Sequence, residues 1–155
     1  MIHPTAEIGN PPEHRDWHEG DPSFWPEVGD GVRISSFVTI DSGLHRPTKV
    51  GAETLLLTKS HIGHDCIIGR NCELAPGVVI GGECEIGDLV KIGINASVRP
   101  FIKIGDGARI GAGAVVVNDI PPGQTWAGVP ARRLFKDEKE KAAEWGKALP
   151  ASMRA

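Results

Sequence analysis

The sequence predicts an all-β fold, a parallel β-helix built from hexapeptides, and three observations carry that prediction. Every sixth residue from Val50 is aliphatic, in twelve successive positions without exception: Val50, Leu56, Ile62, Ile68, Leu74, Ile80, Ile86, Ile92, Val98, Ile104, Ile110 and Val116. A glycine follows eight of them, and the residue two positions before each is mostly small or β-branched. A period of six fits neither a helix nor an ordinary strand, and is typical of a β-helix.

The repeat implies a three-sided prism in which three successive hexads close one coil. The aliphatic residue points inward and stacks on its counterpart one coil away, at about 4.8 Å. We expect glycine to follow it because the corner there requires a positive φ. The inward position two residues earlier holds all three cysteines, Cys66, Cys72 and Cys84. That register favours small buried thiols over disulfides, metal ligands or nucleophiles.

The N-terminal part carries the same repeat with two interruptions. Ile2 and Ile8 are six residues apart and predict an opening turn. Residues 10–27 then break the pattern with four prolines and two tryptophans, which favours a packed, functional excursion over disorder. The hexads resume at Val28, and a second excursion, residues 41–49, precedes the main run.

The C-terminal part ends the prism. A proline-rich exit, Asp119 to Arg133, is expected to stop the strand ladder after about Val117. Residues 136–149 are rich in helix formers and predict a short helix. We therefore expect a β-helix of about five to six coils over residues 1–134, followed by a C-terminal helix and tail over residues 135–155. Open coil ends and flat faces suggest a homo-oligomer.

Composition excludes several classes of protein. The 17 Lys and Arg residues against 20 Asp and Glu residues, a net charge of −3, argue against sequence-independent nucleic-acid binding. The sequence contains no apolar run long enough for a membrane span and no signal-peptide pattern. We expect a cytoplasmic protein without nucleic-acid or membrane partners.

The candidate chemistry lies at one corner of the main run. His64 follows the inward Ile62 by two residues, so it projects outward, and Gly82 stands three hexads later, one coil away. A neutral imidazole can accept a proton from a hydroxyl or amine while a backbone N–H binds an oxyanion. Asp65 could orient that imidazole. On this pattern alone, a surface histidine remains the alternative.

From Ile8 to about Leu134 the chain resembles the left-handed β-helix (hexapeptide-repeat) acyltransferases, above all the UDP-N-acetylglucosamine O-acyltransferases. The resemblance rests on residues 8–34, on SSFVTID (35–41), on TKVGAETLLL (48–57) and on SHIGHDCIIGRNC (60–72). The exit DIPPGQTWAGVPARRL (119–134) is similar to the tail of coenzyme A-dependent sugar acetyltransferases.

The resemblance implies a left-handed prism and a homotrimer with active sites between subunits. It implies that His64 is the catalytic base, that Asp65 supports it and that Gly82 is the oxyanion donor. His61 matches a histidine that lines the acceptor pocket, and Asp16 matches an acidic residue that binds the sugar acceptor. The implied reaction transfers an acyl group, with no metal required.

Other positions depart from the lipid A enzymes, which carry further His and Lys residues where this chain has Glu83, Arg99 and His18. We expect these three at the substrate site, although His18 could be a plain loop residue and Arg99 a bridge between subunits. The exit favours a short acyl group on coenzyme A, with acetyl-CoA as the expected cosubstrate. The residues expected to contact coenzyme A are Ala112, Trp126, Arg132 and Arg133. For Trp126 a cap over the prism end is the alternative, and for the two arginines a solvated surface.

The expected function is therefore an acyl-CoA-dependent O- or N-acyltransferase, an acetyltransferase acting on a sugar or nucleotide sugar. Two alternatives stand beside it. A γ-class carbonic anhydrase-like metal protein would need three converging histidines, and only His61 and His64 lie close in sequence. A scaffold or binding subunit would keep the fold and lack the chemistry.

Overall fold

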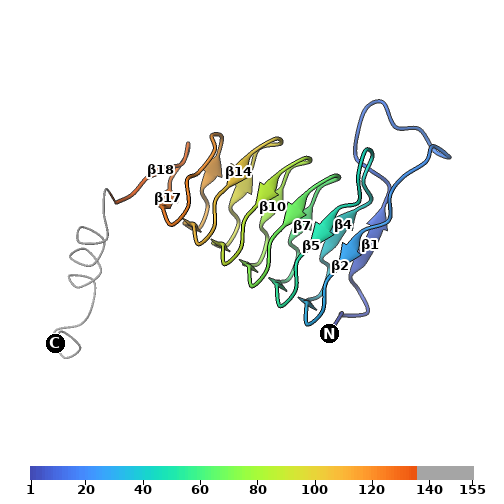
Figure 1. Ribbon diagram of the computed structural model, residues 1–155, viewed down its shortest axis with the longest axis horizontal. Helices are drawn as coiled ribbons and strands as arrows, with labels where there is room; N and C mark the ends of the chain where they lie inside the picture. The colour runs from blue at the N-terminus through green and yellow to red at the C-terminus, as the bar shows by residue number, and fades with distance from the viewer. Residues whose placement is uncertain (136–155) are drawn as a thin grey trace.

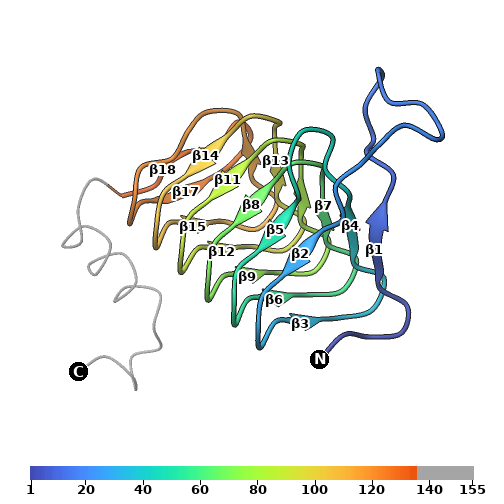
Figure 2. The same cartoon turned by 45° about the vertical axis from the view of Figure 1, so that its right-hand side comes forward.

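The computed structural model describes residues 1–135 as a prism of three parallel sheets (Figures 1 and 2). Within this part of the chain every regular element is a strand, which confirms the all-β prediction. It contains no helix that is long and apolar enough to cross a membrane. The predicted C-terminal helix falls in residues 136–155, outside the described residues.

Along the prism each sheet collects every third strand, so that one coil contributes one strand to each face, and the last two described strands depart from this order by joining the same sheet. The first sheet contains β1 (Glu7–Asn10), β4 (Thr39–Asp41), β7 (His61–Ile62), β10 (Val79–Ile80), β13 (Ser97–Val98) and β16 (Val115–Val116). The second contains β2 (Glu27–Val28), β5 (Lys49–Val50), β8 (Ile67–Ile68), β11 (Glu85–Ile86) and β14 (Lys103–Ile104). The third contains β3 (Arg33–Ile34), β6 (Leu55–Leu56), β9 (Glu73–Leu74), β12 (Lys91–Ile92), β15 (Arg109–Ile110), β17 (Thr125–Ala127) and β18 (Arg132–Arg133).

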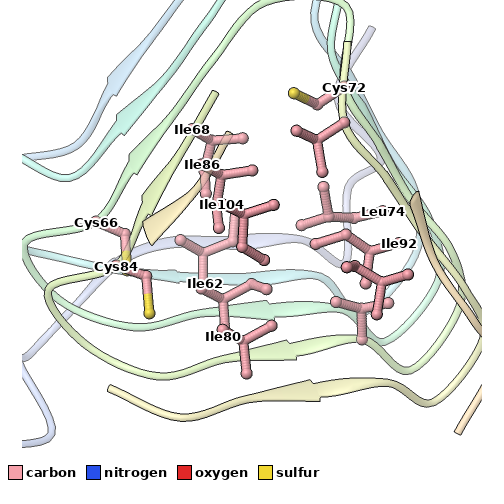
Figure 3. Close-up of a cluster of buried hydrophobic side chains, with 14 of the residues drawn as sticks. Ile62, Cys66, Ile68, Cys72, Leu74, Ile80, Cys84, Ile86, Ile92 and Ile104 are labelled. Atoms are coloured by element: carbon pink, nitrogen blue, oxygen red, sulfur yellow. The ribbon is translucent and has the colours of Figure 1, made fainter. Parts of the chain in front are cut away.

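The predicted register is confirmed. Ile62 pairs with Ile80, and Ile68 with Ile86, so that each residue meets its counterpart one coil away in a neighbouring parallel strand. Figure 3 shows these aliphatic side chains stacked as columns inside the prism. Every residue of the second inward register from Thr54 to Ala114 is also buried. The hydrophobic effect therefore acts along a linear core that each added coil extends.

The three cysteines are free and buried, as the register predicts. Each thiol donates to a carbonyl of the next coil, with sulfur–oxygen distances of 3.1 Å from Cys66 to Gly81, 3.0 Å from Cys72 to Gly87 and 3.2 Å from Cys84 to Arg99. Burial raises the pKa of Cys72. These thiols are core groups that connect coils.

The expected role of the glycines is wrong. Positive φ occurs three residues after the aliphatic position, at glycines such as Gly77 and at side chains such as Asp65 and Asn71. In the main run from Val50, the glycine directly after the aliphatic residue has no positive φ. It is needed because a Cβ there would meet the backbone of the next coil, at 2.8 Å for Gly63 and 2.5 Å for Gly69.

The two ends of the prism also differ in detail from the prediction. Ile2 bridges to Ile34 and β1 pairs with β4, so the opening turn is confirmed. At the other end the ladder continues beyond the prolines, because β17 pairs in parallel with β15. β18 then folds back antiparallel on β17. The expected stop near Val117 therefore comes too early.

The two excursions pack on one another at the end of the prism that holds β1 (Figures 1 and 2). The first occupies residues 11–26, and the second the residues between Asp41 and Lys49. Phe24 and Gly43 exchange two backbone hydrogen bonds of 2.8 Å. The ring of Trp25 lies directly against Gly9, which leaves no room for a side chain there. Phe24 and Trp25 are nevertheless 47% and 68% exposed, so the expectation of a packed first excursion stays a prediction.

Candidate active site

The corner after β7 brings His64 against Gly82. The N–H of Glu83 donates to the carbonyl of His64 at 2.8 Å, which stacks the two corners one coil apart, as the repeat predicts. A Cβ on Gly82 would lie 2.5 Å from the Nε2 atom of His64. The imidazole therefore occupies the space that any other residue at 82 would fill. Within the described part of the chain the Gly82 N–H donates to no protein group.

His64 is oriented by its neighbour. Its Nδ1 lies 2.7 Å from Oδ2 of Asp65, and the two side chains are 11% and 2% exposed. An ionised carboxylate only accepts hydrogen bonds, so Nδ1 carries the proton and donates it to Asp65. The lone pair of the neutral imidazole is then on Nε2, the atom beside Gly82.

Asp65 is held by the second excursion. The N–H groups of Leu44, His45 and Arg46 donate to its carboxylate at 3.0, 2.7 and 2.7 Å. Burial opposes ionisation, but the hydrogen bonds from His64 and from these three N–H groups outweigh it and lower the pKa of Asp65. Asp65 has φ of 59°, in a region that aspartate tolerates better than most residues.

The first excursion covers His64 from the other side. The ring of His14 packs edge to face on the ring of His64, with 5.4 Å between centroids. The sequence does not predict this contact, because His14 lies in the first excursion and has no place in the repeat. Asp16 lies beside it: the Asp16 N–H donates to Nδ1 of His14 at 3.2 Å. Asp16 is thus linked to His64 through His14.

His61 forms a second polar group three residues before His64. Its Nδ1 lies 2.8 Å from Oγ1 of Thr39, and its Nε2 lies 3.8 Å from Oδ2 of Asp41. Asp41 is buried, and burial raises its pKa to about 6 against the attraction of His61. Repulsion from Glu13 also raises it. Asp41 and Glu13 were not singled out from the sequence, because neither stands in the repeat register that marks the corner.

The remaining expected substrate residues are less tightly placed. Glu83 is half-buried on the coil next to Asp65, at φ of 59°. Arg99 is exposed one coil beyond Gly81. His18 is 80% exposed and contacts Asp21 within the excursion, with its N–H donating at 2.8 Å.

The expected coenzyme A residues lie at the C-terminal end of the prism. Trp126 packs against the core and its Nε1 donates to Gln124 at 2.8 Å, which is the arrangement of a cap. Arg132 is exposed and donates to the carbonyl of Ala131. Ala112 is exposed, and Arg133 pairs with Trp126 across β17 and β18.

This corner does not support the carbonic anhydrase-like alternative, which needs several histidines on one metal ion. His61 and His64 contact different groups, Thr39 and Asp65. Within the described residues, the group of side chains that could hold a metal ion contains a single histidine: Glu13, Asp41 and His61.

Comparison with known proteins agrees with the repeat and the fold. Residues 47–82 and 83–118 match the model of the bacterial transferase hexapeptide (six repeats). The chain is 36% identical to UDP-3-O-acylglucosamine N-acyltransferase from Methylorubrum populi over 137 residues, 85% of this chain and 39% of that protein. It therefore spans less than half the length of this curated relative.

Solved structures share the fold. UDP-N-acetylglucosamine O-acyltransferase from Moraxella catarrhalis is 27% identical, with a TM-score of 0.82 over 99% of this chain and 65% of that one. A mutant of perosamine N-acetyltransferase from Caulobacter crescentus, in complex with CoA and GDP-perosamine, is 29% identical with a TM-score of 0.72. The match covers 87% of this chain and 56% of that one. Residues 47–118 therefore carry the bacterial transferase hexapeptide repeat, and the chain shares the left-handed parallel β-helix fold of these solved structures.

Proposed function

We propose that this chain is an acyltransferase that moves a short acyl group from coenzyme A to a hydroxyl or amino group of a nucleotide sugar. The observation that carries the proposal is the stack of His64 on Gly82, with Asp65 fixing the imidazole. The relatives support the substrate classes, since they include an N-acyltransferase and an N-acetyltransferase in complex with CoA and a nucleotide sugar.

The reaction follows from the positions of these groups. Nε2 of His64 accepts the proton of the acceptor hydroxyl or amine as that atom attacks the thioester carbonyl carbon. The carbonyl oxygen becomes an oxyanion and receives a hydrogen bond from the Gly82 N–H. Collapse of the tetrahedral intermediate breaks the carbon–sulfur bond, and the coenzyme A thiolate takes the proton from His64. Asp65 stabilises the imidazolium in between.

We assign roles to the other expected residues from their positions around His64 and Gly82. Asp16, His18, His61, Glu83 and Arg99 are proposed to bind the acceptor, and Asp16 lies beside the base through His14. Ala112, Trp126, Arg132 and Arg133 are proposed to bind coenzyme A at the C-terminal end. Trp126 can serve there while it caps the core, because its half-buried ring keeps an exposed part.

We further propose a homotrimer, with active sites between subunits, that works in the cytoplasm. The flat sheet faces and the family likeness support the trimer. Three free, buried thiols fit a reducing compartment. Sedimentation equilibrium measures the trimer directly, and a monomer at micromolar concentration would contradict it.

The test of the function is a thiol-release assay. Purified protein is incubated with acetyl-CoA, and with longer acyl-CoAs, against a panel of UDP-, GDP- and TDP-sugars with free amino or hydroxyl groups. We expect release of free coenzyme A that depends on the acceptor, and a matching gain of one acyl group in the sugar by mass spectrometry. Absence of acceptor-dependent release across the panel would contradict the proposal and favour a scaffold.

A further inference from the structure

A second polar cluster lies where the first excursion crosses β4 and β7. Glu13 comes from the excursion, Asp41 ends β4 and His61 begins β7. One ligand atom from each of these residues lies within 4.8 Å of the other two. The three residues belong to segments distant in sequence, so the fold itself gathers them.

The histidine is oriented toward the acidic groups. Thr39 contacts its Nδ1 at 2.8 Å, which leaves Nε2 to face Asp41. Nε2 and Oδ2 are 3.8 Å apart, too far for a hydrogen bond. A cation with ligand distances of about 2.0–2.2 Å from each atom would span that gap. A hydrogen-bonded second ring nitrogen is also the usual arrangement of a metal-binding histidine.

The carboxylate of Asp41 provides an independent observation. Asp41 is 1% exposed, and its Oδ2 has no hydrogen-bond partner among the described residues. Burying a carboxylate oxygen without a partner costs free energy that a cation would recover. The unpartnered atom is the one that faces His61.

We propose that Glu13, Asp41 and His61 bind a divalent metal ion, and the donor set favours Zn²⁺. One imidazole and two carboxylates supply nitrogen and oxygen ligands in the number that zinc takes with water in the fourth position. The two carboxylates balance the charge of the ion. Glu13 is exposed, so its side chain can move the remaining distance to the ion.

The ion would fasten the first excursion to the coil. Glu13 is adjacent to His14, which packs on His64, so a metal at this site would fix the segment that covers the proposed base. The base itself is spared, because His64 keeps its hydrogen bond to Asp65. His61 would then serve the acceptor site as part of its wall, since its Nε2 is occupied by the ion. The site is structural and supplies no step of the proposed reaction.

The test is a metal titration of the full chain after removal of metals with a chelator. We expect the wild type to bind one Zn²⁺ per chain by calorimetry, and Glu13→Gln and Asp41→Asn to weaken binding at least about tenfold. Glu19→Gln removes an exposed carboxylate of the same excursion and should bind as the wild type does. Far-UV circular dichroism checks that Asp41→Asn is folded, and Glu13→Gln alters an exposed side chain only.

Cobalt identifies the ligands. Co²⁺ in the site should give visible absorption bands without the charge-transfer band of a thiolate, and Asp41→Asn should lose them. A wild type that binds neither Zn²⁺ nor Co²⁺ would overturn the proposal. Wild-type affinity in both carboxylate variants, or a thiolate band from the cysteines, would also overturn it.

Discussion

Two neighbouring corners of the prism share one backbone and carry different chemistry. Gly63, His64 and Asp65 turn the chain after β7, and Gly69, Arg70 and Asn71 turn it after β8. The third residue has φ of 59° in one and 53° in the other. In both, a Cβ on the first glycine would meet the next coil.

The two corners differ in the groups that lie over their side chains. The side chain of Arg70 is 69% exposed and contacts Asp88, one coil away, at 3.1 Å. Asp88 in turn accepts the Arg70 N–H, and Asp106 accepts the Asp88 N–H, each at 2.8 Å. His64 faces Gly82 instead and lies under His14 and the second excursion. The repeat therefore sets the position of a corner side chain, and the excursions determine whether that side chain is covered, like His64, or exposed to solvent, like Arg70.

The largest effect is expected for His64→Ala. Removal of the general base should reduce turnover at least about 10²-fold and leave the circular dichroism spectrum unchanged. Arg70→Ala at the neighbouring corner is the matched control and should change turnover by less than about twofold. Equal losses in the two variants would mean that the covered corner has no special role.

Gly82→Ala should reduce turnover about 10²-fold by displacing the imidazole. Alanine is tolerated by the backbone at this repeat position, since Ala52 and Ala112 occupy it elsewhere. The penalty should therefore come from the collision with Nε2 of His64. A double-mutant cycle checks this collision. Gly82→Ala should lower the free energy of unfolding in the wild-type background but change it little in the His64→Ala background. If Gly82→Ala lowers the free energy of unfolding equally in both backgrounds, the added methyl group does not collide with His64.

Asp65→Asn should lower the free energy of unfolding by about 1 kcal/mol at neutral pH, because charged hydrogen bonds are lost. Asparagine keeps the tolerance for positive φ. Since the folded protein lowers the pKa of Asp65, its contribution is present above the unfolded value of about 4 and is lost as pH falls through the folded pKa.

Urea unfolding at pH 7 and at pH 3 therefore measures the pH dependence. The difference in the free energy of unfolding between the wild type and Asp65→Asn should be smaller at pH 3 than at pH 7. A gap that grows on acidification would contradict the ionised state of Asp65.

The smallest effect is expected for the stability of Arg70→Ala. The pair of Arg70 with Asp88 is exposed, so Tm should stay within about 2 °C of the wild-type value. High salt should change the stability of the two proteins alike. A large loss in Tm would show that the exposed corner is a structural element of the prism and weaken the contrast with His64.

Much of the fold follows from the sequence, because a strict period places every inward residue. Ile62 and Ile80 are separated by three hexads, as are His64 and Gly82, and that spacing alone predicts their stacking. The sequence places the corner glycines correctly but does not give the reason for them. They are needed because the next coil approaches closely, not because of a positive φ, and that approach is visible only in the three-dimensional packing. The ladder beyond the exit prolines was missed because β17 needs no N–H from either proline.

The remaining contacts of the candidate site involve segments that lie outside the hexapeptide repeat. His14 on His64, Asp41 beside His61 and the three N–H groups around Asp65 all come from the excursions or their edges. No spacing rule relates such residues to the coil. One signal was present: Asp65 directly follows His64, and a carboxylate beside a histidine can orient its imidazole.

The most direct test of the central claim is a crystal structure with coenzyme A and the acceptor identified by thiol release. We expect the acceptor nucleophile within about 3.2 Å of Nε2 of His64, and the coenzyme A sulfur on the same side as the Gly82 N–H. An acceptor or a coenzyme A thiol bound at a different face of the prism, away from the His64 corner, would contradict the account.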